Sequence, residues 1–296
     1  MSATGTTAAR AAGPAPGFLR RALRAGPFAW IVWGGVAFFL ANLAALILSV
    51  VVNSFAVNWF DGWLPSAFTT DWYAEAWREF NLADVLLVTL IVALVVVGLS
   101  LLFGVPAAYA LARRNFPGRQ AVMLLLLLPV LLPPITYGIP LATLMYKIGL
   151  AGSLAGVIAV NLVPALPFVV LVMTPFIEQI DVNIEAAARM CGAGTRQVFT
   201  RVLVPLLVPG ILAAAVLVLV RTVAMFELTF LVAGPDSQTL IVALYSAAFT
   251  PGIRAAQAID AMAVIYTLLS ATLLVIALSF VNPTQIVAQV KEVNPE

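Results

Sequence analysis

The sequence predicts an all-α polytopic membrane protein with six transmembrane helices. Of its 296 residues, 63% are hydrophobic and 9% are charged, whereas soluble domains are about 45–50% apolar and about 25% charged. The apolar residues form runs that are long enough to cross a bilayer, which takes about 20 residues. The basic residues gather in alternate connections between these runs, as in proteins that cross a membrane several times.

The predicted spans follow one another along the chain. They cover residues 28–52, 85–111, 121–146, 154–176, 206–232 and 261–281. Gly98 and Gly104 in the second span allow close approach of another helix. Prolines in the third and fourth spans predict kinked or partly unwound helices, which membranes tolerate where protein or a water-filled cavity satisfies the backbone. These prolines are Pro129, Pro133, Pro134, Pro140, Pro164 and Pro167. They either bend the helices generically or help to line a pathway, and the sequence leaves both readings open.

The segments outside the spans have distinct compositions. Residues 1–26 are rich in Ala, Gly, Pro and Thr and contain arginines, which predicts a disordered, basic cytoplasmic tail rather than a cleaved signal peptide. Residues 27–281 are predicted to form one transmembrane domain, and residues 282–296 a short cytoplasmic tail. Tryptophans in residues 53–84 indicate an interfacial aromatic belt with a short amphipathic element. The apolar run 240–249 is too short to span and is predicted to be an interfacial or re-entrant helix.

The basic residues also predict the orientation. If the N-terminus lies inside, 11 of the 15 Lys and Arg residues fall in cytoplasmic segments and 3 in external ones, with Arg221 inside a span. Positive charges are enriched on the cytoplasmic side of membrane proteins. We therefore expect both termini, and the connection at residues 181–205, to be cytoplasmic.

The connection at residues 181–205 is a charged island between two apolar spans, and its pattern predicts a helix–turn–helix hook on the membrane surface. Apolar residues at helical spacing form one face of a first short helix. These residues are Ile184, Ala187, Ala188 and Cys191. Glu185 and Arg189 lie beside this face, and Gly192 and Gly194 end the helix.

The second half of the hook returns to the membrane. Thr195 is predicted to cap a second short helix, in which Val198, Phe199 and Val202 share a face. Pro205 marks the re-entry into the next span. A charged, helix-prone loop of this kind is typical of a segment that a membrane protein presents to a soluble partner.

The hook resembles the EAA loop of type I ABC importer permeases. The pattern of that loop is Glu-Ala-Ala, three residues, Gly, nine residues, Ile, one residue, Leu-Pro. Aligned on Gly192, the matching positions are Ala187, Ala188, Val202, Val204 and Pro205. Ala186 occupies the position of the Glu, and Glu185 lies one residue earlier, where many relatives carry a second Glu. The carboxylate of the motif is therefore either supplied by Glu185 or absent.

The resemblance, which covers about residues 81–281, implies a fold and a set of partners. The fold is the MetI-like permease fold of type I importers, with five core helices and an additional N-terminal one. In that family the loop is the coupling helix, which docks on a cytosolic ABC ATPase dimer. The residues expected to form this coupling loop are Glu185, Ala186, Ala187, Ala188, Arg189, Gly192, Thr195, Phe199 and Pro205.

The expected assembly lies in the bacterial inner membrane. It contains a second permease chain, which we favour as a different homologous chain, and an extracytoplasmic solute-binding protein, with no nucleic acid. This sequence lacks the Gly-Lys-Ser/Thr of a P-loop. No cofactor is therefore expected in this chain, and ATP and Mg are expected to bind the partner ATPase.

Polar residues inside the spans are the candidates for a substrate pathway or gate. Arg221 and Glu227 lie in the fifth span, and burial of each at a helix centre costs about 2.5–3.5 kcal/mol. Because they are six residues apart, they do not share a helical face, and a direct pair is not expected. Either they are structural or they line the path. The other candidates are Tyr137, Asn161 and Thr174, although most such groups are expected to be hydrogen-bonded packing residues.

The sequence favours a transport role over catalysis. It has no histidine and a single cysteine, Cys191, which excludes Cys/His and Ser/His/Asp catalytic sets. The stretch from Arg221 to Glu227 resembles permeases for ferric iron, polyamines and related solutes, so the leading interpretation is a permease for a small polar or charged, polyamine-like solute. A sugar permease is the runner-up. A self-sufficient secondary carrier or channel is the alternative from another class.

Overall fold

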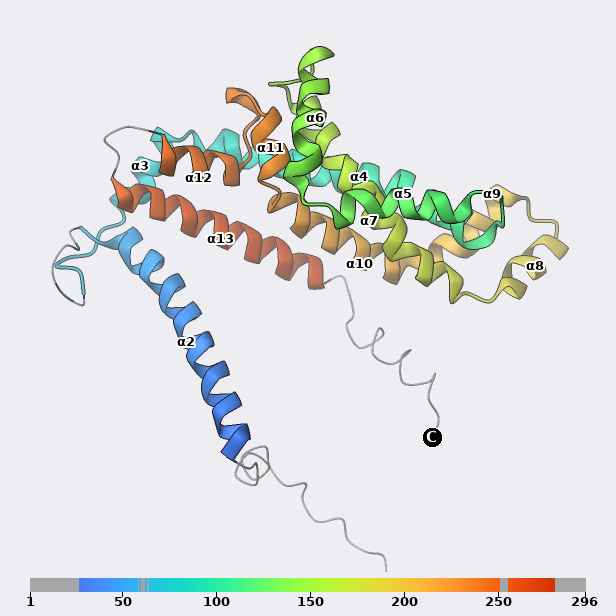
Figure 1. Cartoon of the computed structure of the whole chain (residues 1–296), viewed down its shortest axis with the longest axis horizontal. Coiled ribbons are helices and arrows are strands. Elements are labelled where there is room, and N and C mark those ends of the chain that lie inside the picture. Colours follow the sequence, from blue (N-terminus) through green and yellow to red (C-terminus); the bar gives the residue numbers. More distant parts are fainter. Residues whose placement is uncertain (1–26, 58, 60–61, 63, 251–254, 280–296) are drawn as a thin grey trace, which may run out of the picture. The chain divides into compact units, whose positions relative to one another are not determined.

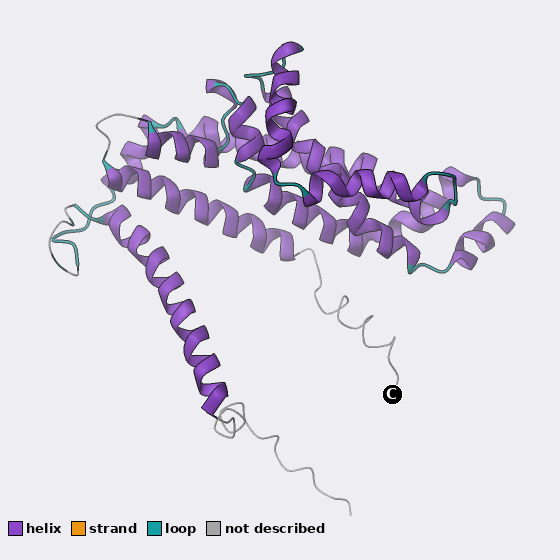
Figure 2. Ribbon diagram, viewed as in Figure 1, coloured by secondary structure: helices purple, strands orange, loops and turns teal. Residues whose placement is uncertain are grey.

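The computed structural model describes residues 27–279 apart from 58, 60–61, 63 and 251–254. The described residues are nearly all helical, with one isolated bridge between Ala56 and Phe68 (Figure 2). The chain divides into two compact units, Met1–Val52 and Asn53–Glu296. Helix α2 (Pro27–Phe55) accounts for the described part of the first unit. The predicted tails, residues 1–26 and 282–296, lie outside the described residues.

The described residues contain five continuous helices that are long and apolar enough to cross a membrane. They are α2, α4 (Leu82–Arg113), α7 (Leu154–Glu178), the continuous stretch Thr195–Val223, and α13 (Ala256–Ser279). A sixth span is a bent pair, α5 (Arg119–Leu131) and α6 (Pro134–Lys147), whose axes differ by 99°. The prediction of an all-α polytopic protein with six spans is thus confirmed.

The prolines break one predicted span and leave another intact. Between α5 and α6 the chain is extended at Pro133, which agrees with the predicted unwinding of the third span. The fourth span was predicted to be kinked or partly unwound; helix α7 runs through Pro164 and Pro167 without interruption, so it is not unwound there. The fifth span was predicted as one helix to residue 232, and this is wrong. Three residues separate the end of helix α10 (Val204–Val223) from the start of α11 (Glu227–Val232).

Helices α4 and α7 pack against each other at the centre of the second unit. A methyl group added at Gly104 of α4 would lie 2.7 Å from a side-chain carbon of Val169 on α7, so only glycine permits this approach. Gly98 has nothing within 4 Å of the same construction, and its predicted role in close packing is wrong. The surrounding core also includes Val198 and Leu203, which anchor the second half of the hook.

The short helices lie at opposite ends of the second unit (Figure 1). At one end, α3 (Asp71–Glu79) and α12 (Leu240–Phe249) share an apolar core with the starts of α4 and α13. They match the predicted amphipathic element and the predicted short apolar helix. At about 1.5 Å per residue, ten residues of α12 cover about 15 Å, half of a bilayer core. The hook lies at the other end, beyond α10.

Two turns hold α11 in place by backbone contact. Gly152 N–H donates to the carbonyl oxygen of Val232 (2.8 Å), and Ser237 Oγ donates to the carbonyl oxygen of Gly152 (3.1 Å). A Cβ at Gly234 would lie 2.6 Å from the Gly152 oxygen, so the approach requires glycine at position 234, whereas Gly152 is favoured by its φ of +77°. This contact fixes the turn before α7 against the turn that follows α11.

Candidate functional site

The hook begins with a short capped helix. Helix α8 (Val182–Met190) starts after Asp181, whose Oδ1 accepts a hydrogen bond from the backbone N–H of Asn183 (2.9 Å). Such a cap satisfies one of the donors that a helix start leaves unpaired. After α8 the chain turns at Gly192, which has φ of +84°, a conformation that favours glycine. The predicted helix and the predicted glycine turn are both present.

The second half of the hook runs into the membrane-spanning helix without a gap. Helix α9 (Thr195–Gln197) continues through a π-helical segment, Val198–Leu203, into α10. Thr195 is the first residue of α9 and not its cap, so that prediction is wrong. Gly194 holds the cap position, and the Gln197 side chain accepts a hydrogen bond from its N–H (3.1 Å).

The predicted apolar face of this second half packs on the bundle. Val198 is buried, and Phe199 and Val202 are half-buried. The Phe199 ring meets the Tyr109 ring edge to face, with centroids 5.5 Å apart. Pro205 lies exposed near the start of α10.

Glu185 is turned into the protein and is 4% exposed. Arg113 Nε donates to Glu185 Oε1 (2.7 Å), and the Tyr109 hydroxyl donates to Glu185 Oε2 (2.8 Å). Arg113 also donates through Nη2 to the carbonyl oxygen of Ile180 (2.6 Å). Arg189 Nη2 lies 3.9 Å from Glu185 Oε2, a looser contact. This buried network, Tyr109–Arg113–Glu185, ties α8 to the end of α4.

The remainder of α8 is exposed. Ala186 and Ala187 face solvent, and Ile184 is 42% exposed. Met190 is 89% exposed, whereas Ala188 packs partly against the core. The apolar face predicted for α8 is therefore mostly exposed, whereas the side chain of Glu185 beside it is buried.

Sequence reasoning missed Tyr109 and treated Arg113 only as a marker of the cytoplasmic side. A signal was present, because residues four apart on a helix share a face. Tyr109 and Arg113 are such a pair in the last turns of α4. Their partner Glu185 is 72 residues beyond Arg113, and nothing local in the sequence links them.

A groove of about 600 Å³ separates α8 from the end of α4, and we term it the α4–α8 groove. Its lining includes Arg113, Arg114 and Arg189 together with Glu185 and the exposed Met190. Three guanidinium groups and one carboxylate give it an excess of positive charge. It is open to the same surface as α8.

The pathway candidates Arg221 and Glu227 lie on either side of the break in the fifth span. Arg221 is in the last turn of α10 and Glu227 in the first turn of α11. Each charge therefore lies at the helix end where the helix dipole favours it. No ion pair joins the two among the described residues. The Arg221 guanidinium lies 5.3 Å from the centroid of the Phe168 ring, a cation–π contact.

The structure brings Tyr137 to the same region. Its hydroxyl, at 3.3 Å from the carbonyl oxygen of Pro129, bridges the bend between α5 and α6. Tyr137 is half-buried and packs against the cluster that includes Met225 and Leu228, beside the break that Arg221 and Glu227 flank. Three of the predicted polar residues, Tyr137, Arg221 and Glu227, therefore lie beside the breaks in the third and fifth spans.

The other two candidates are buried in helix packing. Asn161 Nδ2 donates to Thr229 Oγ1 (3.1 Å), which ties α7 to α11. Thr174 Oγ1 donates to the carbonyl oxygen of Val170 within α7 (2.7 Å). Both side chains have the partners that we expected of packing residues at membrane depth.

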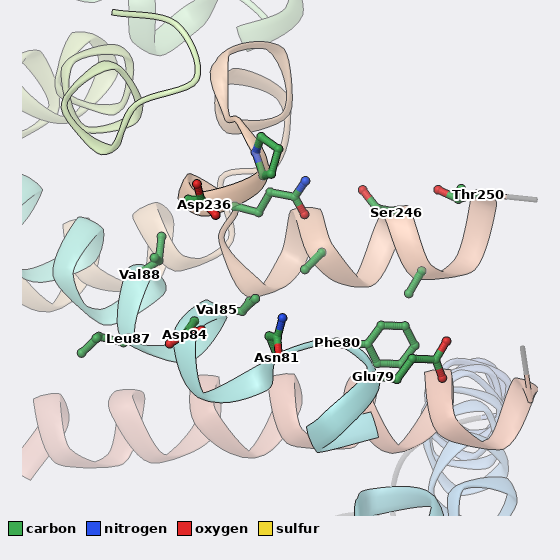
Figure 3. Close-up of a pocket in the computed structure, with 14 residues that line it drawn as sticks. Glu79, Phe80, Asn81, Asp84, Val85, Leu87, Val88, Asp236, Ser246 and Thr250 are labelled. Carbon is green, nitrogen blue, oxygen red and sulfur yellow. The ribbon is translucent and has the colours of Figure 1, made fainter. Parts of the chain in front are cut away.

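At the opposite end, a cavity of about 470 Å³ lies between α3, α12 and the first turn of α4, and we term it the α3–α12 cavity. Figure 3 shows Asp84 and Asn81 on one side of it, and Ser246 of α12 with Thr250, which follows that helix, on another; Asp236 lies near the start of α12. Sequence reasoning did not find this site, since its residues come from three distant segments. Within the described ranges, no group of three His, Cys, Asp or Glu side chains could hold a metal ion.

Residues 100–286 match the sequence profile of the family described as binding-protein-dependent transport system inner membrane component. The trehalose transport system permease protein SugB of Mycobacterium tuberculosis is 33% identical over 157 residues, which are 53% of this chain and 57% of that protein. The molybdenum transport system permease protein ModB of Haemophilus influenzae is 34% identical over 174 residues, which are 52% of this chain and 76% of that protein.

A solved structure has a similar fold. It is a chain of a bacterial ABC transporter involved in the import of the acidic polysaccharide alginate, with a TM-score of 0.72. The superposition covers 91% of this chain and 100% of that chain at 18% sequence identity, so the likeness concerns the fold.

Proposed function

The chain belongs to the binding-protein-dependent transport system inner membrane component family, and we propose that it forms the translocation path for a small polar or charged solute. As an ABC importer permease, it is a non-catalytic membrane subunit whose ATPase is a separate chain. The observation that carries the proposal is the hook. Its α8 presents exposed apolar residues while Glu185 and Arg113 clamp it to α4.

In the proposed mechanism, ATP binding closes the partner ATPase dimer and draws together the hooks of two permease chains. Because Glu185 is bonded to Arg113, displacement of α8 moves α4, and α7 follows because it is packed closely on α4. The cavity between the permease chains then opens outward, and hydrolysis resets the inward-facing state. This is alternating access driven by a partner.

The partners follow from the same proposal. A solute-binding protein delivers its cargo at the end that carries α3 and α12, outside the membrane. The hook and both termini lie in the cytoplasm, where the hook meets the ATPase. A second permease chain, homologous to this one and favoured as a different sequence, completes the path.

Two solute classes have support from different observations. The carboxylates of Asp84 and Asp236 around the α3–α12 cavity favour a cationic, polyamine-like solute, because they attract positive charge. The identity to a trehalose permease favours a sugar. We place Arg221, Glu227 and Tyr137 on the path, since they surround the breaks in two spans, where backbone and charge need a polar environment.

Reconstitution in proteoliposomes tests this function. The permease chains with their ATPase and the loaded binding protein should take up solute only with ATP, whereas the permease alone should take up none under an ion gradient. Spermidine, trehalose and molybdate should be offered in parallel to the binding protein. Arg221→Ala in the full complex should reduce uptake, with Arg221→Lys less affected. Gradient-driven uptake by this chain alone would contradict the proposal.

A further inference from the structure

We propose that the α4–α8 groove is a second docking site for the ATPase, which receives an acidic side chain of that partner between Arg114 and Arg189. The inference rests on the proposed function, because it takes the hook to face the ATPase. It adds a contact of defined chemistry beside the exposed surface of α8.

The three arginines that line the α4–α8 groove differ in whether another group of the protein pairs with their charge. Arg113 is engaged by Glu185 and by the carbonyl oxygen of Ile180, and its side chain is 11% exposed. The side chain of Arg189 is 56% exposed and reaches Glu185 only at 3.9 Å. Arg114 is exposed, and its guanidinium makes no ion pair or hydrogen bond with the described residues. Two cationic groups thus remain available to a ligand.

The shape of the groove suits a protein side chain. About 600 Å³ is enough for a carboxylate-bearing residue and its neighbour. Met190, Val182 and Ala186 provide exposed apolar walls, so a segment that combines an acidic with an apolar side chain would complement the site. Guanidinium groups bind carboxylates through paired, charge-assisted hydrogen bonds, which makes Arg114 and Arg189 suitable partners.

The position of the groove favours the ATPase as the occupant. It is lined by the end of α4, by α8 and by Thr195, so residues on both sides of the turn at Gly192 contribute to it. The buried Tyr109–Arg113–Glu185 network forms one side of it, so the groove keeps its shape when α8 moves with α4. A carboxylate bound there would grip α8 and α4 at once.

The test is the affinity of purified ATPase for the permease chains held in lipid nanodiscs. Arg114→Glu should weaken binding at least about tenfold, because it replaces attraction by repulsion in a partly enclosed site. Arg114→Gln should weaken it less. Arg201→Glu is the matched control, since Arg201 is an exposed arginine of the same end that does not line the groove, and it should leave the affinity nearly unchanged.

The outcomes separate the inference from the proposed function. If Gly192→Val abolishes ATPase binding while Arg114→Glu binds as wild type does, the groove assignment is overturned and the hook assignment stands. If Arg114→Glu and Arg201→Glu weaken binding equally, the effect is one of general charge and the inference is also overturned. An Arg114→Glu effect confined to nanodiscs with anionic phosphatidylglycerol, and absent with phosphatidylcholine, would make lipid headgroups the occupant and would overturn it too.

Discussion

The carboxylate of Glu185 points away from the surface that α8 exposes. The EAA pattern left two possibilities for this side chain, a substitute for the missing motif Glu or no equivalent of it. In the structure Glu185 is bound by Arg113 and Tyr109, and the motif position itself, Ala186, is exposed. Glu185 therefore holds α8 against the end of α4 and does not form part of the exposed surface of the hook.

Replacement of Glu185 by Gln should lower the free energy of unfolding by roughly 3 kcal/mol, because Arg113 is left buried without a counter-ion. Glu178→Gln is the control, since the Glu178–Arg119 pair at 3.1 Å is much more exposed than the Glu185 network, and this substitution should cost less than about 1 kcal/mol. Denaturation of the purified protein in detergent micelles measures both. Equal losses would show that the buried network contributes no special stability.

Substitutions at Gly192 can distinguish the effect of backbone conformation from the effect of side-chain size. Nothing lies within 4 Å of a Cβ built there, so substitution meets no steric obstacle, but the φ of +84° is strained for other residues. We expect Gly192→Val to destabilise the turn by about 1–2 kcal/mol and to reduce co-purification of the ATPase while membrane insertion stays normal. Gly192→Asn should be tolerated better, because Asn adopts this conformation more readily. Normal ATPase retention by the Val variant would argue against the hook as a docking element.

At the scale of the elements, the sequence predicts where each span lies better than it predicts whether the helix of that span is continuous. Apolar runs place every span, because bilayer thickness imposes a length that composition reveals. The prolines at 133 and 134 predict a break, yet nothing local specifies its 99° angle, which depends on packing of α6 against α11. Residues 224–226, where the fifth span breaks, include no Pro or Gly, so the sequence gives no local signal for this break. It is fixed by tertiary contacts, among them the Asn161–Thr229 bond and the Gly152–Gly234 approach.

The packing of α4 on α7 gives a prediction at this scale. Gly104→Val should destabilise the bundle by about 2 kcal/mol, because its side chain would overlap Val169 and neither helix can withdraw freely. Gly98→Val, which adds the same atoms to the same helix at an open position, should be close to neutral. Thermal unfolding in detergent compares the two. A neutral Gly104→Val would mean that the contact between α4 and α7 can relax.

At the scale of the whole molecule, charge is divided between the two ends of the second unit. The described residues near the hook include six arginines and three carboxylates. They are Arg113, Arg114, Arg119, Arg189, Arg196, Arg201, Glu178, Asp181 and Glu185. Among the described residues, the end with α3 and α12 has the opposite balance, with carboxylates including Asp71, Asp84 and Asp236 and a single arginine, Arg78. This polarity supports a cytoplasmic hook, which the distribution of basic residues among the connections predicts. The hook is contiguous and could be predicted, whereas the Tyr109–Arg113–Glu185 network and the α3–α12 cavity could not, since each assembles segments far apart in the chain.

Cys191 provides a direct test of orientation. It is the single cysteine of the sequence, and it is exposed beside the turn of the hook. We expect a membrane-impermeant maleimide to label it in inside-out vesicles and not in intact cells, because the proposed function places the hook in the cytoplasm. Bound ATPase should slow the labelling. A Cys191→Ser variant controls for background, and labelling from the outside of cells would reverse the assigned topology.

Helix α4 runs through 32 residues, with Asp84 near its start and Arg113 at its end, a length of about 48 Å. The same helix therefore borders the α3–α12 cavity near its start and carries the Arg113 clamp on α8 at its end. Linkage requires that such a connection work equally in both directions. If a ligand in the α3–α12 cavity shifts α4 and thereby changes the affinity of the hook for the ATPase, bound ATPase must change the affinity for that ligand by the same free energy.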